Sequence, residues 1–161
     1  MDSSRVKTFN DILTPTQFNR LQSHFKSSHF PWYFKPGIDY KDDGKFQFTH
    51  NIYDDYAPQS SVYDSMNEIL SFLKANALIR IKANLQVRTK EIVENSYHVD
   101  YQDCKTAIYY INTNNGYTLF ETGQKIESVA NRLVTFDSNL KHTGSSCTDQ
   151  DTRIVLNFNY F

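Results

Sequence analysis

Residues 79–88 read Ile-Arg-Ile-Lys-Ala-Asn-Leu-Gln-Val-Arg, and this stretch decides the fold. Its apolar and polar side chains alternate at every position. A period of two residues is that of a β-strand with one apolar and one polar face. Before residue 79 the apolar residues recur mainly at helical spacing, and after it short strand-like runs dominate. The sequence therefore predicts N-terminal helices followed by a mainly β region.

Several more strand-like runs lie downstream, and turn formers separate them. The runs cover residues 96–101, 106–112, 117–121, 125–129, 132–136 and 152–161. The turn signals are Asn-Asn-Gly at 114–116, Thr-Gly at 122–123 and Thr-Gly-Ser at 143–145. Many short strands joined by such turns are typical of a double-sheet jelly roll. We therefore expect a double-stranded β-helix of the cupin-like type over residues 79–161.

The first 78 residues are expected to support this core with two helices. Residues 14–17, Thr-Pro-Thr-Gln, read as a capping box with proline at the first helical position. Apolar residues then follow at helical spacing, namely Phe18, Leu21 and Phe25. A second apolar helix face comprises Val62, Met66, Ile69, Leu70 and Leu73. Both helices should pack on the outer face of the sheet, so that residues 1–161 form a single domain.

Residues 31–58 combine many aromatic side chains with turn formers such as Asp-Asp-Gly at 42–44, which predicts irregular structure. Within this stretch, residues 36–56 are the expected mobile lid of a binding site. The predicted substrate contacts are Trp32, Tyr33 and Asn84. If residues 36–56 belong to the scaffold instead, we expect substrate contacts at the 112–116 turn and on the polar strand face of Lys82, Asn84 and Gln86.

The run Tyr97-His98-Val99-Asp100 places an imidazole and a carboxylate two residues apart. On a β-strand this spacing directs both side chains to the same face. His142, in a polar stretch expected to be a turn, is the predicted third ligand. Two histidines and one carboxylate suit non-haem Fe(II), because they leave three coordination positions open for a co-substrate and O2. The sequence therefore predicts that His98, Asp100 and His142 are the catalytic iron ligands.

Arg153 follows on a late apolar strand. A guanidinium group binds carboxylates in a bidentate manner, so Arg153 is suited to hold the far carboxylate of a small diacid, which points to 2-oxoglutarate. Asn157 shares the strand face of Arg153, and we expect it to bond the co-substrate or a metal ligand. The other histidines, His24, His29 and His50, lack ligand spacing and are expected to be structural or exposed.

Composition excludes several function classes. The chain has 161 residues and a formal net charge of −1, so it has no overall basic field that would attract nucleic acid. Cys104 and Cys147 form no CxxC motif, and the first residues lack a following apolar run. No stretch reaches the apolar length needed to span a bilayer. We expect a cytoplasmic protein that binds neither nucleic acid nor membrane.

From His98 to Phe161 the chain resembles the Fe(II)- and 2-oxoglutarate-dependent dioxygenases, in particular their prolyl-hydroxylase-like branch. Residues 106–112 are similar to the strand that follows the His-x-Asp motif in hypoxia-type prolyl hydroxylases. Residues 131–137, followed by 142–144, are similar to the strand and turn that lead to the distal histidine. The front half, including residues 30–34, is similar to small dioxygenases of marine phages and environmental bacteria.

The resemblance implies that Tyr110 bonds the co-substrate carboxylate, that Arg153 is the 2-oxoglutarate arginine, and that O2 is consumed, with ascorbate as a reductant. It implies hydroxylation of an unactivated C–H bond, first of all in a prolyl residue of a peptide or protein. The alternative substrate is a free amino acid or another small molecule. A nucleic-acid demethylase is disfavoured because nothing basic follows Arg153, and a halogenase because Asp100 is present. The alternative from another class is a non-catalytic jelly-roll binding module.

Overall fold

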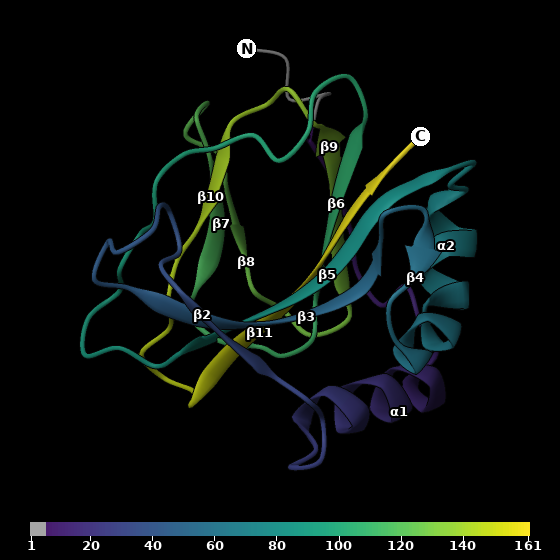
Figure 1. Ribbon diagram of the computed structural model, residues 1–161, viewed down its shortest axis with the longest axis horizontal. Coiled ribbons are helices and arrows are strands. Elements are labelled where there is room, and N and C mark those ends of the chain that lie inside the picture. Colours follow the sequence, from purple (N-terminus) through teal and green to yellow (C-terminus); the bar gives the residue numbers. More distant parts are fainter. Residues whose placement is uncertain (1–5) are drawn as a thin grey trace.

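The computed structural model describes residues 6–161, and two antiparallel sheets form its framework (Figure 1). The strands are β1 Val6–Phe9, β2 Tyr33–Pro36, β3 Phe46–Asp54, β4 Ala57–Pro58, β5 Leu78–Val87, β6 Lys105–Tyr110, β7 Tyr117–Phe120, β8 Lys125–Glu127, β9 Arg132–Asp137, β10 His142–Gly144 and β11 Thr152–Tyr160. The larger sheet has the order β1-β9-β6-β11-β5-β3-β2, with β4 paired to β3. The smaller sheet has the order β10-β7-β8 and stands opposite the larger one. The predicted jelly roll is confirmed, but its large sheet also contains β1 to β4, which precede the predicted start at residue 79.

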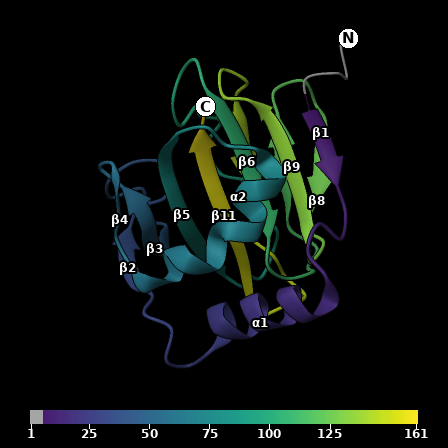
Figure 2. The same cartoon turned by 90° about the vertical axis from the view of Figure 1, so that its right-hand side faces the viewer.

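Helices α1 (Pro15–Lys26) and α2 (Asn67–Leu73) cover the outer face of the larger sheet, with a 3₁₀ helix at Ser61–Met66 leading into α2 (Figure 2). The predicted capping box starts α1. The Gln17 backbone N–H donates to Thr14 Oγ1 at 3.3 Å, and the Thr14 N–H donates to Gln17 Oε1 at 3.0 Å. Within residues 6–161, no helix combines the length and the apolar character that a membrane crossing requires.

The alternation of β5 gives the larger sheet its two different faces. The apolar residues of β5, including Ile81 and Ala83, join those of β11, such as Leu156, in the core beneath the helices. The opposite face of the two strands is polar, and it lines a cavity between the sheets rather than open solvent. This face carries Arg80, Lys82, Asn84 and Gln86 from β5, and Arg153, Val155 and Asn157 from β11.

Two predictions around the metal ligands were wrong in detail. Residues 96–101 form no regular strand, and this segment meets β10 only through the isolated bridges Glu94–Ser145 and His98–His142. Only single residues of the segment pair with β10, and Asp100 instead bonds to Asn157 of the large sheet. Residues 142–144, in contrast, do not form a turn. They are strand β10, which pairs with β7 through the register His142–Phe120.

The predicted irregular stretch 31–58 contains three strands, and this changes the predicted lid. Strand β3 lies between β2 and β5 in the large sheet, so residues 46–54 are scaffold. Only residues 37–45 form a loop beside the cavity. The Asp43 carboxylate organises this loop by accepting the backbone N–H groups of Ile38, Asp39 and Lys45 at 2.8–3.0 Å.

We expect hydrogen exchange to separate the scaffold from the loop. Amides of β3 that bond to β2 and β5 should exchange at least about a hundredfold more slowly than those of the exposed loop tip, residues 40–42, because they open only with the sheet. Mass spectrometry of peptides from residues 36–56 measures both rates. Uniformly rapid exchange across residues 36–54 would restore the original lid and contradict the strand assignment.

Candidate metal centre

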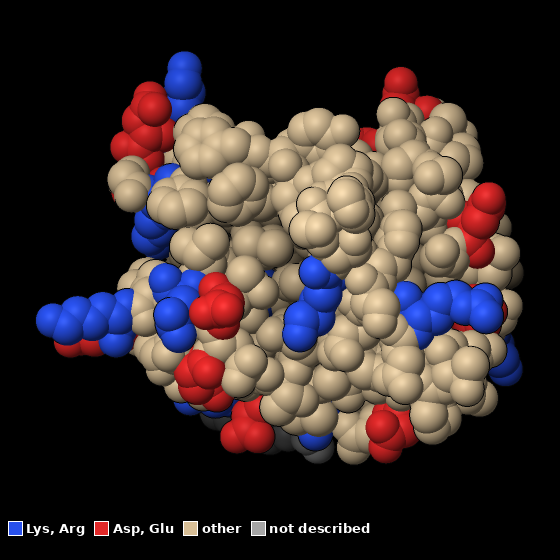
Figure 3. All heavy atoms as spheres, turned by 90° about the horizontal axis from the view of Figure 1, so that it is seen from below, with Lys and Arg blue, Asp and Glu red and all other residues tan. Residues whose placement is uncertain are grey.

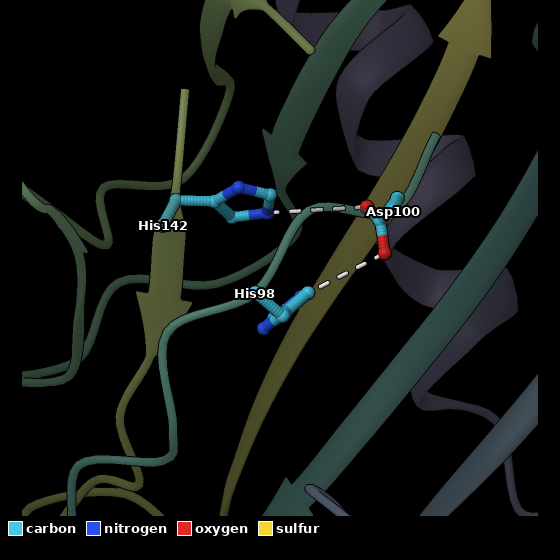
Figure 4. Close-up of side chains that lie close together, drawn as sticks. All are labelled: His98, Asp100 and His142. Carbon is cyan, nitrogen blue, oxygen red and sulfur yellow. Dashed lines mark ion pairs between the residues drawn. The ribbon is translucent and has the colours of Figure 1, made fainter. Parts of the chain in front are cut away.

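The three predicted ligands converge at one end of the cavity (Figure 4). His98 and Asp100 come from the loop between β5 and β6, and His142 is the first residue of β10. One ligand atom from each residue lies within 4.8 Å of the others. The Nε2 atoms of His98 and His142 lie 3.7 Å and 3.9 Å from the Asp100 carboxylate oxygens. All three donor atoms therefore face one common point.

A pair of backbone hydrogen bonds joins the two histidines. The His98 N–H donates to the His142 carbonyl at 2.9 Å, and the His142 N–H donates to the His98 carbonyl at 3.1 Å. Residues that face each other in an antiparallel pair place their side chains on the same side. The ring centroids are consequently 4.7 Å apart. This single bridge positions two ligands that are far apart in the sequence.

Backbone carbonyls also select the tautomer of both rings. His98 Nδ1 lies 3.1 Å from the Ser96 carbonyl oxygen, and His142 Nδ1 lies 3.4 Å from the Leu140 carbonyl oxygen. A carbonyl oxygen only accepts hydrogen bonds, so each Nδ1 carries the hydrogen. The Nε2 lone pairs are then free to bind a metal ion, and the carbonyls fix the orientation of the rings.

Asp100 is held as a carboxylate by two side chains from the sheet. Arg80 Nη2 lies 3.3 Å from Oδ1, and Asn157 Nδ2 donates to Oδ2 at 2.8 Å. Burial alone would raise the pKa of Asp100, but Arg80, the two histidines and the Asn157 hydrogen bond together lower it below its usual value. Asn157 thus contacts a predicted metal ligand, as one of its two expected roles requires.

His142 is deeply buried and stays neutral at neutral pH. Its ring packs against Phe136 and Phe120, with centroids 4.8 Å and 6.3 Å away. Burial, with the neighbouring His98, lowers the pKa of His142 to about 4 despite the nearby Asp100. Two imidazoles with free Nε2 atoms and one ionised carboxylate form a donor set that fits a divalent iron ion with open positions.

Arg153 lies in the same cavity, which has a volume of about 360 Å³. Its side chain is 4% exposed, and it donates from Nε to Ser128 Oγ at 2.9 Å and from Nη2 to Thr118 Oγ1 at 3.3 Å. Within the described residues no carboxylate pairs with it. Burial lowers the pKa of Arg153. A buried charge without a partner is strongly unfavourable, so the position fits a ligand that brings its own carboxylate.

Two glycines leave room for the Arg153 side chain. A Cβ at Gly116 would lie 2.7 Å from Arg153 Cδ and also 2.7 Å from the Ser146 carbonyl oxygen. A Cβ at Gly144 would lie 3.3 Å from Arg153 Nη1. Larger residues at these positions would push the guanidinium group out of place. The glycine expected to form a turn at residue 116 therefore also shapes the carboxylate site.

The other predicted site residues have different surroundings. Tyr110 is fully buried behind Arg153, and its hydroxyl donates to Thr118 Oγ1 at 2.7 Å. Asn84 lines the cavity, whereas Trp32 and Tyr33 do not. Trp32 packs on Phe30 and donates from its indole to the Phe25 carbonyl at 3.4 Å, and Tyr33 is 62% exposed. His50, as expected, is structural, with both ring nitrogens 2.8 Å from protein oxygens.

Sequence reasoning missed the residues that position the predicted ones. Arg80, Thr118 and Ser128 contact Asp100 or Arg153. Arg80 belongs to the polar set of the alternating strand, which could have marked it as a residue facing the site. Nothing local to Thr118 or Ser128 indicates their role, because their contacts depend on how the two sheets stack.

The loop at residues 37–45 closes one side of the cavity. Asp39 accepts the Ser96 backbone N–H at 2.7 Å and the Lys45 ammonium at 2.7 Å. Lys45 also reaches Asn95 Oδ1 at 3.4 Å. The loop is therefore connected directly to the segment that carries His98.

We predict that Asp100→Ala abolishes tight binding of Fe(II), and that Asn157→Ala weakens it by roughly 10- to 100-fold, because Asn157 orients the ligand carboxylate. Anaerobic titration calorimetry with Fe(II) measures both. Asn159→Ala is the matched control: Asn159 is a neighbour on the same strand face and donates to Thr106, 3.2 Å away, instead of to Asp100. Equal affinities of the Asn157→Ala and Asn159→Ala variants would contradict the assigned role of Asn157.

We predict that Arg153→Leu weakens 2-oxoglutarate binding far more than Fe(II) binding. A lost charge-assisted, buried contact is worth about 2–4 kcal/mol, or roughly thirty- to a thousand-fold. Tyr110→Phe should cost about 1 kcal/mol, since Tyr110 acts through Thr118. Arg88→Leu removes a half-exposed arginine paired with Asp151 and should change neither affinity. If Arg153→Leu lowered the affinities for Fe(II) and 2-oxoglutarate equally, the role of Arg153 would be structural only.

Comparison with protein-family models and with curated proteins finds no match to this chain. Comparison with solved structures does find matches. A prolyl hydroxylase from Trichoplax adhaerens, in complex with a hypoxia-inducible-factor oxygen degradation domain peptide fragment, is 12% identical with a TM-score of 0.68, covering 99% of this chain and 84% of that chain.

Two further matches are an epimerase and a bacterial hydroxylase. The non-haem α-ketoglutarate-dependent epimerase SnoN from nogalamycin biosynthesis is 9% identical with a TM-score of 0.68, covering 97% of this chain and 77% of that chain. A prolyl-4-hydroxylase from Pseudomonas putida is 14% identical with a TM-score of 0.58, covering 96% and 91%. At such identities the likeness establishes the fold, which is the jelly roll of the Fe(II)- and 2-oxoglutarate-dependent oxygenases.

Proposed function

We propose that this protein is an Fe(II)- and 2-oxoglutarate-dependent dioxygenase that hydroxylates an unactivated C–H bond. One observation carries the proposal: the cavity lined by His98, Asp100 and His142 also contains the buried guanidinium of Arg153, which pairs with no carboxylate of the described residues. A metal site alone needs no such cation. A dicarboxylate co-substrate needs both, because one carboxylate binds the metal and the other binds the arginine.

Each residue has a defined task in this proposal. The Nε2 atoms of His98 and His142, with one oxygen of Asp100, would hold the iron on one face. Arg80 and Asn157 keep Asp100 ionised and oriented. Arg153 fixes the far carboxylate and thereby determines which end of 2-oxoglutarate meets the metal.

The bound iron, 2-oxoglutarate and O2 would supply the oxidising power, through decarboxylation of 2-oxoglutarate. In the balanced reaction, a C–H bond, 2-oxoglutarate and O2 give C–OH, succinate and CO2. The protein contributes binding, orientation and partial exclusion of water. Ile108 and Val155 are apolar residues that line the cavity, and Val155 lies between Arg153 and Asn157 on β11. Apolar lining of this kind restricts water near the reacting atoms.

A prolyl residue in a peptide was the first substrate expected, and a free amino acid or another small molecule was the alternative. Both kinds of substrate have precedents among proteins of this fold. The Trichoplax enzyme was solved with a peptide fragment, and SnoN was solved with nogalamycin RO. The fold therefore does not choose between them, and the choice depends on the cavity of this chain.

Nucleic acid remains a disfavoured substrate. On the face that Figure 3 shows, Lys and Arg alternate with Asp and Glu, and wide areas carry no charge. Duplex binding relies on contiguous cations that neutralise phosphates. On this face, the surface gives no support to a nucleic-acid demethylase.

The proposal predicts a spectroscopic and a chemical result. Anaerobic addition of Fe(II) and 2-oxoglutarate should produce a weak visible charge-transfer band, and admission of O2 with ascorbate as reductant should produce succinate. Asp100→Ala should lose both signals while circular dichroism stays unchanged, because strand pairing does not depend on this side chain. If the unmodified protein gave neither the charge-transfer band nor succinate, that result would favour a non-catalytic binding module.

A further inference from the structure

Positive charge in the cavity exceeds the negative charge available to balance it. Four cationic side chains line it, namely Lys35, Arg80, Lys82 and Arg153, against two acidic ones, Asp39 and Asp100. Asp39 is paired with Lys45 at 2.7 Å, and Asp100 with Arg80 at 3.3 Å. Arg153 is assigned to the co-substrate. Lys35 and Lys82 therefore have no acidic partner within the described residues.

Lys82 is the more informative of these two, because it lies in the middle of the sheet. It faces the cavity from β5 and is directly opposite Asn157 of β11. Directly opposite residues have Cβ atoms about 4.5–5.5 Å apart. Since Asn157 donates to Asp100, Lys82 lies beside the metal ligand set. Asn157 and Arg153 are four positions apart on β11, a distance of about 13 Å along the strand, so the two cations serve different parts of the cavity.

The environment of Lys82 is unfavourable for an unpaired ammonium group. Its side chain is only partly exposed, and no ion pair or hydrogen bond from the described residues reaches its Nζ. Burial, followed by Arg80 and Lys35, lowers the pKa of Lys82 to about 8. Lysine usually extends its ammonium to water. A ligand that supplies a negative charge would stabilise the Lys82 ammonium group at this position.

An amide side chain next to Lys82 also lacks a partner. Asn84 follows Lys82 on the same face of β5, and its side-chain oxygen is buried without a hydrogen bond within the described residues. The Gln86 side-chain oxygen also lacks a partner, but Gln86 lies directly opposite Arg153 and so belongs to the co-substrate end of the cavity. Buried acceptors without donors are uncommon and costly in native structures. A ligand with an N–H or O–H group would satisfy Asn84.

We infer that the substrate is a small free acid, whose carboxylate is held by Lys82, with Lys35 at the cavity rim, and whose adjacent N–H or O–H group donates to Asn84. Free α-amino acids and hydroxy acids have this chemistry, and an internal prolyl residue of a peptide does not. The inference rests on the proposed dioxygenase function and specifies its substrate class.

The geometry separates this acid from the co-substrate. The co-substrate follows β11 from the metal ligands to Arg153, whereas the acid would extend across β5 towards β2, where Lys35 lies. Lys35 is exposed and can move onto a bound anion. A carboxylate at Lys82 brings the neighbouring carbons of the acid close to the metal ligands, as C–H hydroxylation requires.

The test measures succinate formation by the Fe(II)-loaded protein with 2-oxoglutarate alone and after adding candidate substrates. The candidates are the free amino acids, their C-terminal amides, and a neutral proline-containing peptide with blocked ends. We expect at least one free acid to stimulate the rate tenfold or more and its amide to fail. Stimulation is the ratio of the rates with and without a candidate, measured for each variant. It should be at least tenfold smaller in Lys82→Met than in the unmodified protein. Lys105→Met changes an exposed position of β6 and should keep the full stimulation.

A second measurement does not depend on finding the natural acid. The unfolding midpoint of the anaerobic Fe(II)- and 2-oxoglutarate-loaded protein is recorded in sodium sulfate and in sodium chloride of equal ionic strength. Exclusion of sulfate from the surface raises the midpoint of every variant alike, so the difference between variants carries the result. With Arg153 occupied, the rise in sulfate over chloride should be larger by about 2 °C or more in the unmodified protein and in Lys105→Met than in Lys82→Met. Lys82→Met should fold, because methionine replaces an unpaired ammonium with an apolar chain.

The outcomes separate the two claims. Absence of both succinate and the charge-transfer band in the unmodified protein would overturn the proposed function. If the unmodified protein forms succinate, three results would overturn the substrate inference. These are equal stimulation by the acids and their amides, stimulation by the blocked peptide alone, and full stimulation of Lys82→Met. If no candidate stimulates, the sulfate measurement decides, and equal shifts in the unmodified protein and Lys82→Met would overturn it.

Discussion

The site depends on the two backbone hydrogen bonds between His98 and His142. They connect the long loop between β5 and β6 to the edge of the small sheet, and they place two imidazoles on the same side. Without this bridge, His98 would have no regular structure to hold it, because the loop pairs with β10 only at isolated residues. The third ligand, Asp100, is instead fixed from the large sheet by Arg80 and Asn157. The candidate metal centre thus joins the two sheets of the jelly roll.

The burial and positive charge of the cavity side chains favour anionic ligands. Arg153 is enclosed by Thr118, Ser128 and the two glycines that leave room for it, and no acidic side chain offsets its charge within the described residues. Lys82 is only partly buried, and it too has no acidic partner within the described residues, nearer the predicted metal ligands. A poorly hydrated cation without a partner is unfavourable, and a bound carboxylate would offset that cost. Two anion positions on one sheet face suit a co-substrate and an acidic substrate that bind together.

Local patterns were sufficient to predict much of the fold and the ligand set. The alternation of β5, the capping box of α1 and the His-x-Asp spacing all depend on near neighbours, and each could be interpreted without tertiary structure. Strand β3 was missed although Phe46, Phe48, His50 and Ile52 alternate with polar residues, because the surrounding turn formers and prolines dominated the interpretation. What could not be predicted depends on register and sheet stacking. That Thr118 and Ser128 meet Arg153, and that Gly116 lies against it, follows from contacts across strands that no local pattern encodes.

The most direct test of the account is a crystal structure grown without oxygen in the presence of 2-oxoglutarate and Mn(II), whose anomalous scattering locates the metal. We predict one metal ion bound by the Nε2 atoms of His98 and His142 and by an Asp100 oxygen, with a carboxylate of 2-oxoglutarate on Arg153 and its other end on the metal. A metal ion bound elsewhere, or 2-oxoglutarate bound without contact to Arg153, would contradict the account.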